Sequence, residues 1–419
     1  MFDRISMIGL GYIGLPTAAL FAARGTKVIG VDVSQHVVDI INAGKIHIVE
    51  PELDGIVHKA VTDGMLHASL TPEAADAFII AVPTPFTEDR QPDLSYIESA
   101  AKMIAPALKE GDLVILESTS PIGATEQMAD WLAEVRPDLS FPQTHGNDAD
   151  IQVAHCPERV LPGHVVRELV ENDRIIGGMT ARASEMAVAM YKKVVQGDCV
   201  VTNARTAEMC KLAENSSRDV QIAFANELSI ISSKFDIDVW ELISLANRHP
   251  RVNILQPGAG VGGHCIAVDP WFIVASAPEE SRLIETARQV NDSKPEWVFQ
   301  QGVRAVTEIL SSSPERSMAD MKVACLGLAF KPDIDDLRES PALQITRKFA
   351  QLGCRVLAVE PHIAELPAKA ADPRIELTDL DVAISEADVI CVLVRHSAFT
   401  GLAARVPAET QLIDVVGLQ

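Results

Sequence analysis

The sequence predicts an α/β protein with two doubly wound domains, joined by a long central helix that belongs to a helical domain. Three observations predict this fold. Short apolar runs typical of buried strands alternate with helical stretches over residues 1–200. A stretch of about thirty residues without Pro or Gly then begins at Ala204. From about residue 315 onward, the alternating pattern of the first region returns.

The first predicted strand leads into the turn GLGYIG, which a helix and a second strand follow. Gly9, Gly11 and Gly14 form a G-x-G-x-x-G motif in the strand–turn–helix setting that holds the pyrophosphate of a dinucleotide. Asp32 ends the second strand, about 20 positions further on, where an acidic residue bonds the ribose 2′-hydroxyl. A carboxylate there repels a 2′-phosphate. Residues 1–200 are therefore predicted to form a Rossmann-like domain that binds NAD.

Further apolar runs in this region predict the other strands of a parallel sheet. These runs span residues 77–85, 113–119, 151–159 and 174–178. Thr84, Thr119 and Glu158 lie at or just past the ends of such strands. Because ligands of doubly wound sheets bind at the carboxyl ends of the strands, we expect these three side chains to face the crevice.

The long helix is predicted over residues 204–235, within a helical domain of residues 201–314. Lys211, Asn215 and Arg218 fall at i, i+4 and i+7, on one face of this helix. Such a stripe is either a solvated surface or the wall of a site between domains.

A glycine-rich loop, GAGVGGHCIAVDP at residues 258–270, surrounds Cys265. Glycine lets a main chain approach a ligand closely, so the thiol is either packed or a nucleophile aimed at that ligand. Hydride removal from an alcohol gives an aldehyde, to which a thiolate adds. Loss of a second hydride gives a thioester, which water cleaves. Cys265 would be the nucleophile, Lys211 with Asn215 would stabilise the oxyanion, and Glu158 or Asp269 would activate water.

The third region, residues 315–419, repeats the opening pattern without its full glycine motif. Its first turn reads GLAFKP and offers Lys331, a residue type that suits a pyrophosphate. We therefore expect this domain to bind a nucleotide diphosphate through charge. His249 and Arg251, shortly before the glycine-rich loop, are further candidates for contacts with phosphate or sugar hydroxyls.

The composition of the chain limits which partners it is expected to bind and where in the cell it is expected to lie. The net charge of −22 argues against nucleic acid or an anionic membrane as the main partner. The seven cysteines show no CxxC spacing, so neither a metal site nor a disulfide framework is expected. The sequence also shows no signal peptide and no apolar run of the roughly 20 residues that span a bilayer. We expect a soluble, cytoplasmic protein.

The chain resembles the UDP-glucose/GDP-mannose dehydrogenase family from end to end. The motifs that carry the resemblance are GLGYIGLP, VPTP, ESTSPIGATE, CPER, EMCKLAENSSRDVQIAFANE, GVGGHCIAVDP and GLAFKPDIDDLRESP. The resemblance implies oxidation of a nucleotide-sugar alcohol to a uronic acid with two NAD per sugar, usually for a surface polysaccharide.

Two stretches resemble one branch of that family. GVGGHCIAVDP has Ile-Ala-Val where UDP-glucose enzymes carry Phe-Pro-Lys, which resembles the UDP-N-acetylhexosamine branch. RHPRVNILQPGAG is similar to members that act on UDP-N-acetyl-D-mannosamine and form the corresponding mannosaminuronate. UDP-N-acetylglucosamine and UDP-glucose remain alternative substrates.

The resemblance also implies roles for individual residues. Cys265 is the nucleophile and Lys211 the proton donor and acceptor. The residues implied to contact NAD are Tyr12, Ile13, Asp32, Thr84, Thr125 and Arg338. Those implied to contact the UDP-sugar are Arg159, Val160, Lys211, Asn215, Arg218, His249, Arg251, Gly262, Phe330 and Lys331. Val416 stands where the family has a basic residue, which predicts weaker substrate binding. A homodimer through the central helix is the expected assembly.

Overall fold

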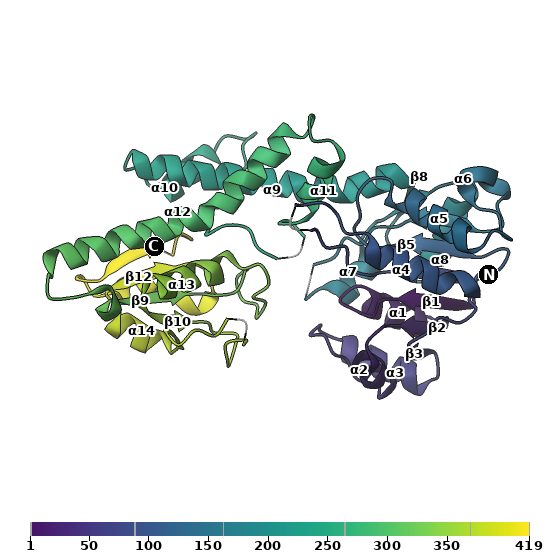
Figure 1. Ribbon diagram of the computed structural model, residues 1–419, viewed down its shortest axis with the longest axis horizontal. Coiled ribbons are helices and arrows are strands. Elements are labelled where there is room, and N and C mark those ends of the chain that lie inside the picture. The colour runs from purple at the N-terminus through teal and green to yellow at the C-terminus, as the bar shows by residue number, and fades with distance from the viewer. Residues whose placement is uncertain (1, 88, 162, 264, 369, 419) are drawn as a thin grey trace. The chain divides into compact units, whose positions relative to one another are not determined.

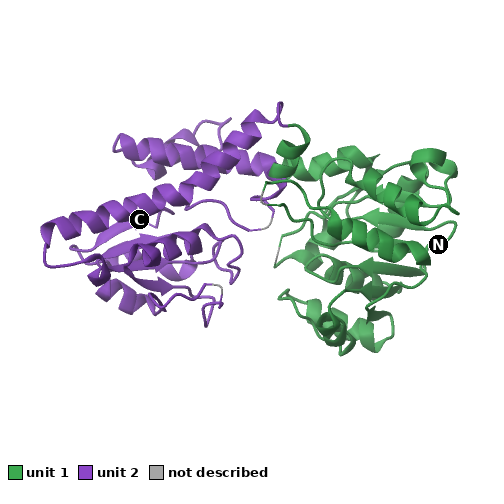
Figure 2. Cartoon of the chain, in the orientation of Figure 1, with its two compact units in different colours: residues 1–214, 271–277 green, residues 215–270, 278–419 purple. Residues whose placement is uncertain are grey.

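The computed structural model describes residues 2–87, 89–161, 163–263, 265–368 and 370–418. The chain forms two compact units, which Figure 2 distinguishes by colour. The first unit holds Met1–Glu214 and Trp271–Ala277, and the second holds Asn215–Pro270 and Pro278–Gln419. The predicted division into three domains remains a prediction.

The first unit is built on one sheet with helices on both faces (Figure 1). Its strands are β1 (Arg4–Ile8), β2 (Lys27–Val31), β3 (Leu66–Ser69), β4 (Ala77–Ile80), β5 (Leu113–Leu116), β6 (Gln152–His155), β7 (Arg174–Gly178) and β8 (Cys199–Asn203). Its helices are α1 (Gly14–Ala23), α2 (Gln35–Asn42), α3 (Leu53–Thr62), α4 (Ser95–Ile104), α5 (Ala124–Val135), α6 (Pro142–His145), α7 (Val165–Glu171) and α8 (Ala181–Tyr191).

The strand order is β3-β2-β1-β4-β5-β6-β7-β8. This order confirms the predicted doubly wound fold, whose topological switch point lies between β1 and β4. The prediction of a wholly parallel sheet is wrong at one edge, since β6 and β7 pair antiparallel and β8 runs parallel to β7. A stretch of apolar residues predicts that a strand is buried, but it does not predict whether the strand pairs parallel or antiparallel.

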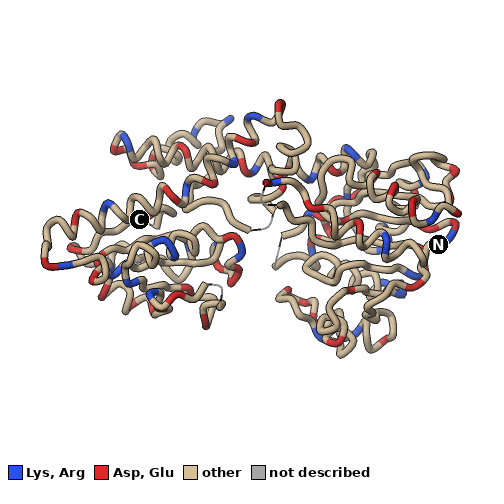
Figure 3. The backbone as a smooth tube through the Cα atoms, in the orientation of Figure 1, with Lys and Arg blue, Asp and Glu red and all other residues tan. Residues whose placement is uncertain are grey.

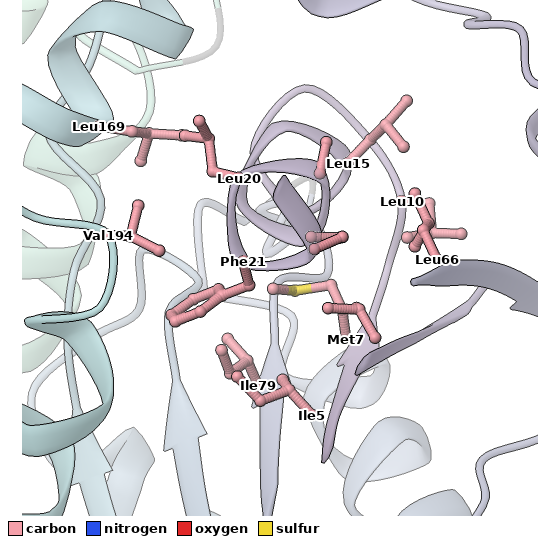
Figure 4. Close-up of a cluster of buried hydrophobic side chains, with 14 of the residues drawn as sticks. Ile5, Met7, Leu10, Leu15, Leu20, Phe21, Leu66, Ile79, Leu169 and Val194 are labelled. Atoms are coloured by element: carbon pink, nitrogen blue, oxygen red, sulfur yellow. The ribbon is translucent and has the colours of Figure 1, made fainter. Parts of the chain in front are cut away.

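The core explains why the strands read as unbroken apolar runs. Successive side chains of a strand point to opposite faces. Ile5, Met7 and Ile79 pack with α1 in one cluster (Figure 4). Phe78 and Ile80 enter a second cluster with α4 and α5 on the other face. Because both faces are covered by helices, every position of β4 is apolar, and β1 is apolar except at Arg4 and Ser6.

The second unit repeats the plan in a smaller sheet. Its strands are β9 (Lys322–Leu326), β10 (Arg355–Val359), β11 (Ile375–Leu377), β12 (Val389–Val392) and β13 (Gln411–Asp414). They pair in parallel, in the order β11-β10-β9-β12-β13. This order matches β3-β2-β1-β4-β5 of the first sheet and confirms the second Rossmann-like fold expected from the repeat.

Two long helices lie between the two sheets in chain order. The predicted central helix is α9 (Ala204–Lys234), and α12 (Arg282–Ser312) has the same length of 31 residues. The sequence pattern does not indicate α12, because Pro295 and Gly302 interrupt it. Within the second unit, α12 packs on α13, β12 and β13. The remaining helices are α10 (Val239–Ala246), α11 (Asp269–Ser276), α13 (Pro341–Leu352) and α14 (Leu380–Glu386). Short 3₁₀ turns lie at Ala105–Ala107, Gly146–Asp148, Met318–Asp320, Ser397–Phe399 and Leu402–Arg405.

None of the helices in the described ranges is both long enough and apolar enough to cross a bilayer. Basic and acidic residues are interspersed along the chain of both units rather than separated by sign (Figure 3).

Candidate active site

The GLGYIG turn has the backbone that a dinucleotide site needs. Gly9 has φ of +90°, and a Cβ on it would lie 2.5 Å from the carbonyl oxygen of Ala81. Its N–H donates to the carbonyl of Val31 at 2.8 Å. A Cβ built on Gly11, in contrast, would meet no protein atom within 4 Å. The turn is therefore tight on the protein side and open where a pyrophosphate approaches, so these residues fit NAD.

Asp32 holds this turn from the end of β2. Its Oδ2 accepts the N–H of Leu10 at 3.1 Å, and its Oδ1 accepts the N–H of Ser34 at 2.9 Å. The carboxylate is half-buried and fixed beside the turn, so it fits the predicted role of bonding the ribose hydroxyls of a dinucleotide. Tyr12 is exposed and Ile13 half-buried in the same turn.

Thr84 and Thr119 follow β4 and β5, beyond the carboxyl ends of these strands. The hydroxyl of Thr84 is buried, and no described residue forms a hydrogen bond with it. Thr119 is half-buried. A buried hydroxyl normally has a partner, so the side chain of Thr84 suits a bound ligand at this edge of the sheet.

Thr125 differs from the other residues implied to contact NAD, because its side chain already has a protein partner. Its hydroxyl donates to Oε1 of Glu208 at 2.6 Å, and its N–H donates to the same oxygen at 2.8 Å. The N–H of Gly123 donates to the other carboxylate oxygen at 2.7 Å. Thr125 thus fixes the start of α5 against α9, and a contact with NAD remains a prediction.

Glu158 is the third residue of the CPER motif and is buried, with 7% of its surface exposed. Its Oε2 accepts the N–H of Val160 at 2.8 Å. Burial raises the pKa of Glu158, and the nearby positive charge of Lys211 opposes that rise without cancelling it. The raised pKa favours a role for this carboxyl group in proton transfer.

Arg159 and Val160 follow directly. Arg159 pairs with Glu214 on α9, with one nitrogen–oxygen distance of 2.6 Å, and Val160 is half-buried. Sequence reasoning missed both Glu208 and Glu214. The available signal was helical spacing, since each lies three positions from Lys211.

In the second unit, Cys265 is exposed in a turn that leads into α11. Its carbonyl accepts the N–H groups of Val268 at 3.1 Å and Asp269 at 2.9 Å. The amide of Asn215 donates to Oδ2 of Asp269 at 2.5 Å. Within this unit, the structure brings together the predicted nucleophile, one predicted carboxylate and the predicted asparagine.

The glycines before Cys265 pack against the GLAFKP turn. A Cβ on Gly262 would lie 2.5 Å from the carbonyl oxygen of Glu339, and one on Gly263 would lie 2.8 Å from the ring of Phe330. The N–H of Gly263 donates to the carbonyl of Arg338 at 3.2 Å. Two sequence-predicted segments, one with the thiol and one with a predicted substrate contact, therefore lie in direct contact.

The other predicted residues are placed as follows. Lys211, Asn215 and Arg218 all lie in α9, with Arg218 exposed. His249 and Arg251 are exposed after α10, and Lys331 is exposed beside Phe330. Arg338 forms an ion pair with Asp336 at 2.6 Å. Val416 is 8% exposed and packs in the core of the second unit. A basic side chain at position 416 would have to leave this packing to reach a ligand.

Comparison with known proteins identifies the family. Models of its NAD-binding, central and UDP-binding domains match residues 3–195, 205–293 and 324–418. The chain belongs to the UDP-glucose/GDP-mannose dehydrogenase family. It is an NAD-dependent oxidoreductase, and NAD is its cofactor.

Several members of this family are similar to the chain over nearly their whole length. UDP-N-acetyl-D-mannosamine dehydrogenase of Campylobacter jejuni is 64% identical, with 95% of this chain and 96% of that protein covered. NDP-N-acetyl-D-galactosaminuronic acid dehydrogenase of Ralstonia nicotianae is 60% identical, with 100% and 96% covered. The structure of UDP-D-ManNAc dehydrogenase from Pyrococcus horikoshii has a TM-score of 0.85 at 36% identity, with 99% of this chain and 96% of that one covered.

Proposed function

We propose that this protein oxidises UDP-N-acetyl-D-mannosamine to UDP-N-acetyl-D-mannosaminuronate with two NAD per sugar, through a covalent intermediate on Cys265. The exposed thiol of Cys265, held in a glycine-rich turn next to the hydrogen-bonded Asn215–Asp269 pair, is the observation that carries the proposal. The names of relatives at 60–64% identity support the sugar.

In the proposed reaction, Lys211 takes the proton of the C6 hydroxyl as the alcohol becomes an aldehyde. The thiolate of Cys265 adds to the aldehyde carbon and gives a thiohemiacetal, whose oxygen Lys211 and Asn215 stabilise. Its oxidation leaves a thioester, and water then releases the carboxylic acid and the free thiol. NAD, held by the GLGYIG turn and Asp32, would supply the hydride acceptor for each of the two oxidations.

We assign activation of the hydrolytic water to Glu158 rather than Asp269. Burial raises the pKa of Glu158, which suits a group that takes a proton from water and returns it. Asp269 already accepts the amide of Asn215 at 2.5 Å, and this bond fixes the orientation of the asparagine.

A second hexosamine is a rival substrate, because the Ralstonia nicotianae relative is named for a galactosaminuronic acid and is 60% identical. UDP-N-acetylglucosamine and UDP-glucose are two more rival substrates. These sugars differ at carbons remote from C6, so they share the chemistry at Cys265 and differ in binding.

We also propose that the protein is a homodimer in the cytoplasm. Its product would serve the synthesis of a surface polysaccharide. Phe224 and Ile231 lie seven positions apart on one face of α9 and are 53% and 44% exposed. Large exposed apolar side chains on one helix face favour an interface with a second copy. Sedimentation of the wild type at micromolar concentration tests this assembly.

The decisive experiment measures NADH released from limiting UDP-N-acetyl-D-mannosamine in the presence of excess NAD. We expect two NADH per sugar, and no mannosaminuronate from Cys265→Ser, because an oxygen ester is a poorer intermediate than a thioester. The Cys210→Ser variant, which alters a neighbouring thiol on α9, serves as the control and should behave as the wild type.

Other outcomes have defined meanings. A yield of one NADH per sugar would mean that the enzyme is a simple alcohol dehydrogenase. Turnover with another UDP-sugar alone would change the substrate but keep the chemistry. Normal acid formation by Cys265→Ser would exclude covalent catalysis.

A further inference from the structure

A network of buried polar side chains connects α9 with α12 in the second unit. Asp219, Asn226, Arg288 and Asn291 are each no more than 1% exposed. Nη1 of Arg288 donates to Oδ1 of Asp219 at 2.6 Å. The amide of Asn291 donates to the same oxygen at 2.8 Å, and the amide of Asn226 donates to Oδ1 of Asn291 at 2.9 Å. The four side chains thus form one continuous chain of hydrogen bonds.

Both ends of this network bond the main chain of the loop that carries Cys265. At one end, the N–H of Gly258 donates to Oδ1 of Asn226 at 3.0 Å. At the other, Nη1 of Arg288 donates to the carbonyl of Ile266, the residue after Cys265, at 3.4 Å. The network therefore meets the loop at its first glycine and just after its thiol.

The composition of the loop explains why it needs such support. Glycine has more backbone freedom than any other residue, so a loop rich in glycine does not fix its own shape. A buried network of hydrogen-bonded polar side chains favours one geometry. Here Oδ2 of Asp219 and Nε of Arg288 form no hydrogen bond with the described residues, and the other bonds of these two side chains hold the arrangement. Contacts of the loop with Phe330 act at its centre, whereas the network acts at its two ends.

We propose that Asp219, Asn226, Arg288 and Asn291 are positioning residues, which hold the loop so that the thiol of Cys265 points at the reacting carbon. These four side chains bond one another and the main chain of the loop. Arg288 also pairs with Asp292 on α12, and Asn291 donates to the carbonyl of Asp219 at 3.0 Å. The proposal rests on the proposed function, because it gives Cys265 the role of the nucleophile. A displacement of about 1 Å at a reacting group costs about 10²-fold in rate, so loss of one end of the network should appear mainly in kcat.

The test uses two variants that act at opposite ends of the network. Arg288→Lys keeps a positive charge beside Asp219 but replaces the forked guanidinium by a single ammonium, which cannot also reach Ile266. Asn226→Ala removes the acceptor for Gly258. The matched control is Arg174→Lys, at another buried arginine, which pairs with Glu117 in the first unit.

Two measurements on each variant separate positioning from simple stability. The first is the rate of alkylation of Cys265 by iodoacetamide without substrate, read by peptide mass spectrometry, with Cys210 as the internal reference. The second compares kcat with the Kd for NAD. We expect Arg288→Lys and Asn226→Ala to change the Cys265 rate by about threefold or more and to lower kcat about 10- to 100-fold, with the Cys210 rate and the Kd for NAD unchanged.

The Arg174→Lys control separates a loss of stability from a loss of positioning at Cys265. Arg174→Lys should lower the melting temperature comparably but leave alkylation of Cys265 unchanged. If the two network variants lose stability yet keep the wild-type Cys265 rate and kcat, the network is only structural. Because alkylation needs no substrate, this result is independent of how many NADH the enzyme forms per sugar.

Discussion

At Glu158, two opposing effects set the protonation of a single carboxyl group. Burial raises its pKa, while the charge of Lys211 and the N–H groups of Val160 and Arg159 lower it, and burial prevails. As the pH falls, a general base with a raised pKa becomes protonated, and so inactive, at a higher pH than an ordinary glutamate does. Activity that depends on the ionised form should therefore fall as the pH decreases through this pKa.

We predict that Glu158→Gln lowers kcat by about 10²- to 10⁴-fold and removes this acid limb from the pH profile, because the amide cannot take a proton from water. The enzyme should then accumulate the thioester, which intact-mass spectrometry after acid quenching would detect. Glu126→Gln, at an exposed carboxylate paired with Arg205, is the control. An unchanged acid limb in Glu158→Gln would assign the base to another group, with Asp269 the first candidate.

At the scale of elements, the glycine-rich loop and the GLAFKP turn are fitted to each other. Gly263 has φ of +81°, and a Cβ there would lie 2.8 Å from the ring of Phe330. Gly64 has φ of +67°, and a Cβ there would meet no atom within 4 Å. Alanine at these two positions imposes similar backbone strain, but only alanine at 263 adds a clash beside the thiol.

We expect Gly64→Ala to destabilise the fold by about 1–2 kcal/mol and to leave kcat unchanged. Gly263→Ala should destabilise it by about 1 kcal/mol more and lower kcat at least about tenfold, since Phe330 and the loop must separate. Chemical denaturation and steady-state kinetics on both variants check this. Equal kinetics in the two variants would show that the contact with Phe330 has no part in placing Cys265.

The internal repeat extends to individual hydrogen bonds. Gly9 and Gly327 have φ of +90° and +89°, and each donates its N–H to the end of the next strand at 2.8 Å. The residue after each glycine donates to an acidic side chain, Asp32 at 3.1 Å and Glu360 at 2.7 Å. Glu360, however, is buried and lies 3.1 Å from Nε2 of His396. The carboxylate of Glu360 therefore bonds groups of the protein itself.

Local patterns account for what the sequence could predict. The glycine turn, α9 and the loop around Cys265 each depend on residues close together in the chain, and spacing reveals them. The partnership of Thr125 with Glu208 and that of Asp219 with Arg288 join residues 83 and 69 positions apart. The hydrophobic periodicity of a sequence does not predict pairs so far apart in the chain. The helix α12 was hidden for a related reason, because packing on α13 and the sheet sustains it across Pro295.

Stability of the whole molecule depends on ionisable groups in its cores, and Lys294 on α12 is the clearest case. Its side chain is 1% exposed, its Nζ lies 2.5 Å from the hydroxyl of Ser229, and the ring centroid of Trp297 is 4.0 Å away. Burial lowers the pKa of Lys294 to about 7, from about 10.5 in the unfolded chain. Native and unfolded states therefore bind different numbers of protons between these two values.

The sign of the resulting pH dependence follows from linkage. Between about pH 7 and 10.5 the unfolded chain holds a proton at Lys294 that the native protein has released, so the free energy of unfolding rises with pH. Below about pH 7 both states hold it, and the native state carries the full cost of the buried charge. Methionine has a similar volume and no charge to bury.

We predict that Lys294→Met raises the free energy of unfolding by about 1–3 kcal/mol at pH 7 and that this gain shrinks toward pH 10. Chemical denaturation of the variant and the wild type from pH 6.5 to 9.5 would measure both the size and the slope. Lys234→Met, at an exposed lysine on α9, should change stability by less than about 0.5 kcal/mol at every pH. A gain that stays constant with pH would mean that Lys294 keeps its proton inside the fold, and that the ring of Trp297 and the hydroxyl of Ser229 stabilise the charge against burial.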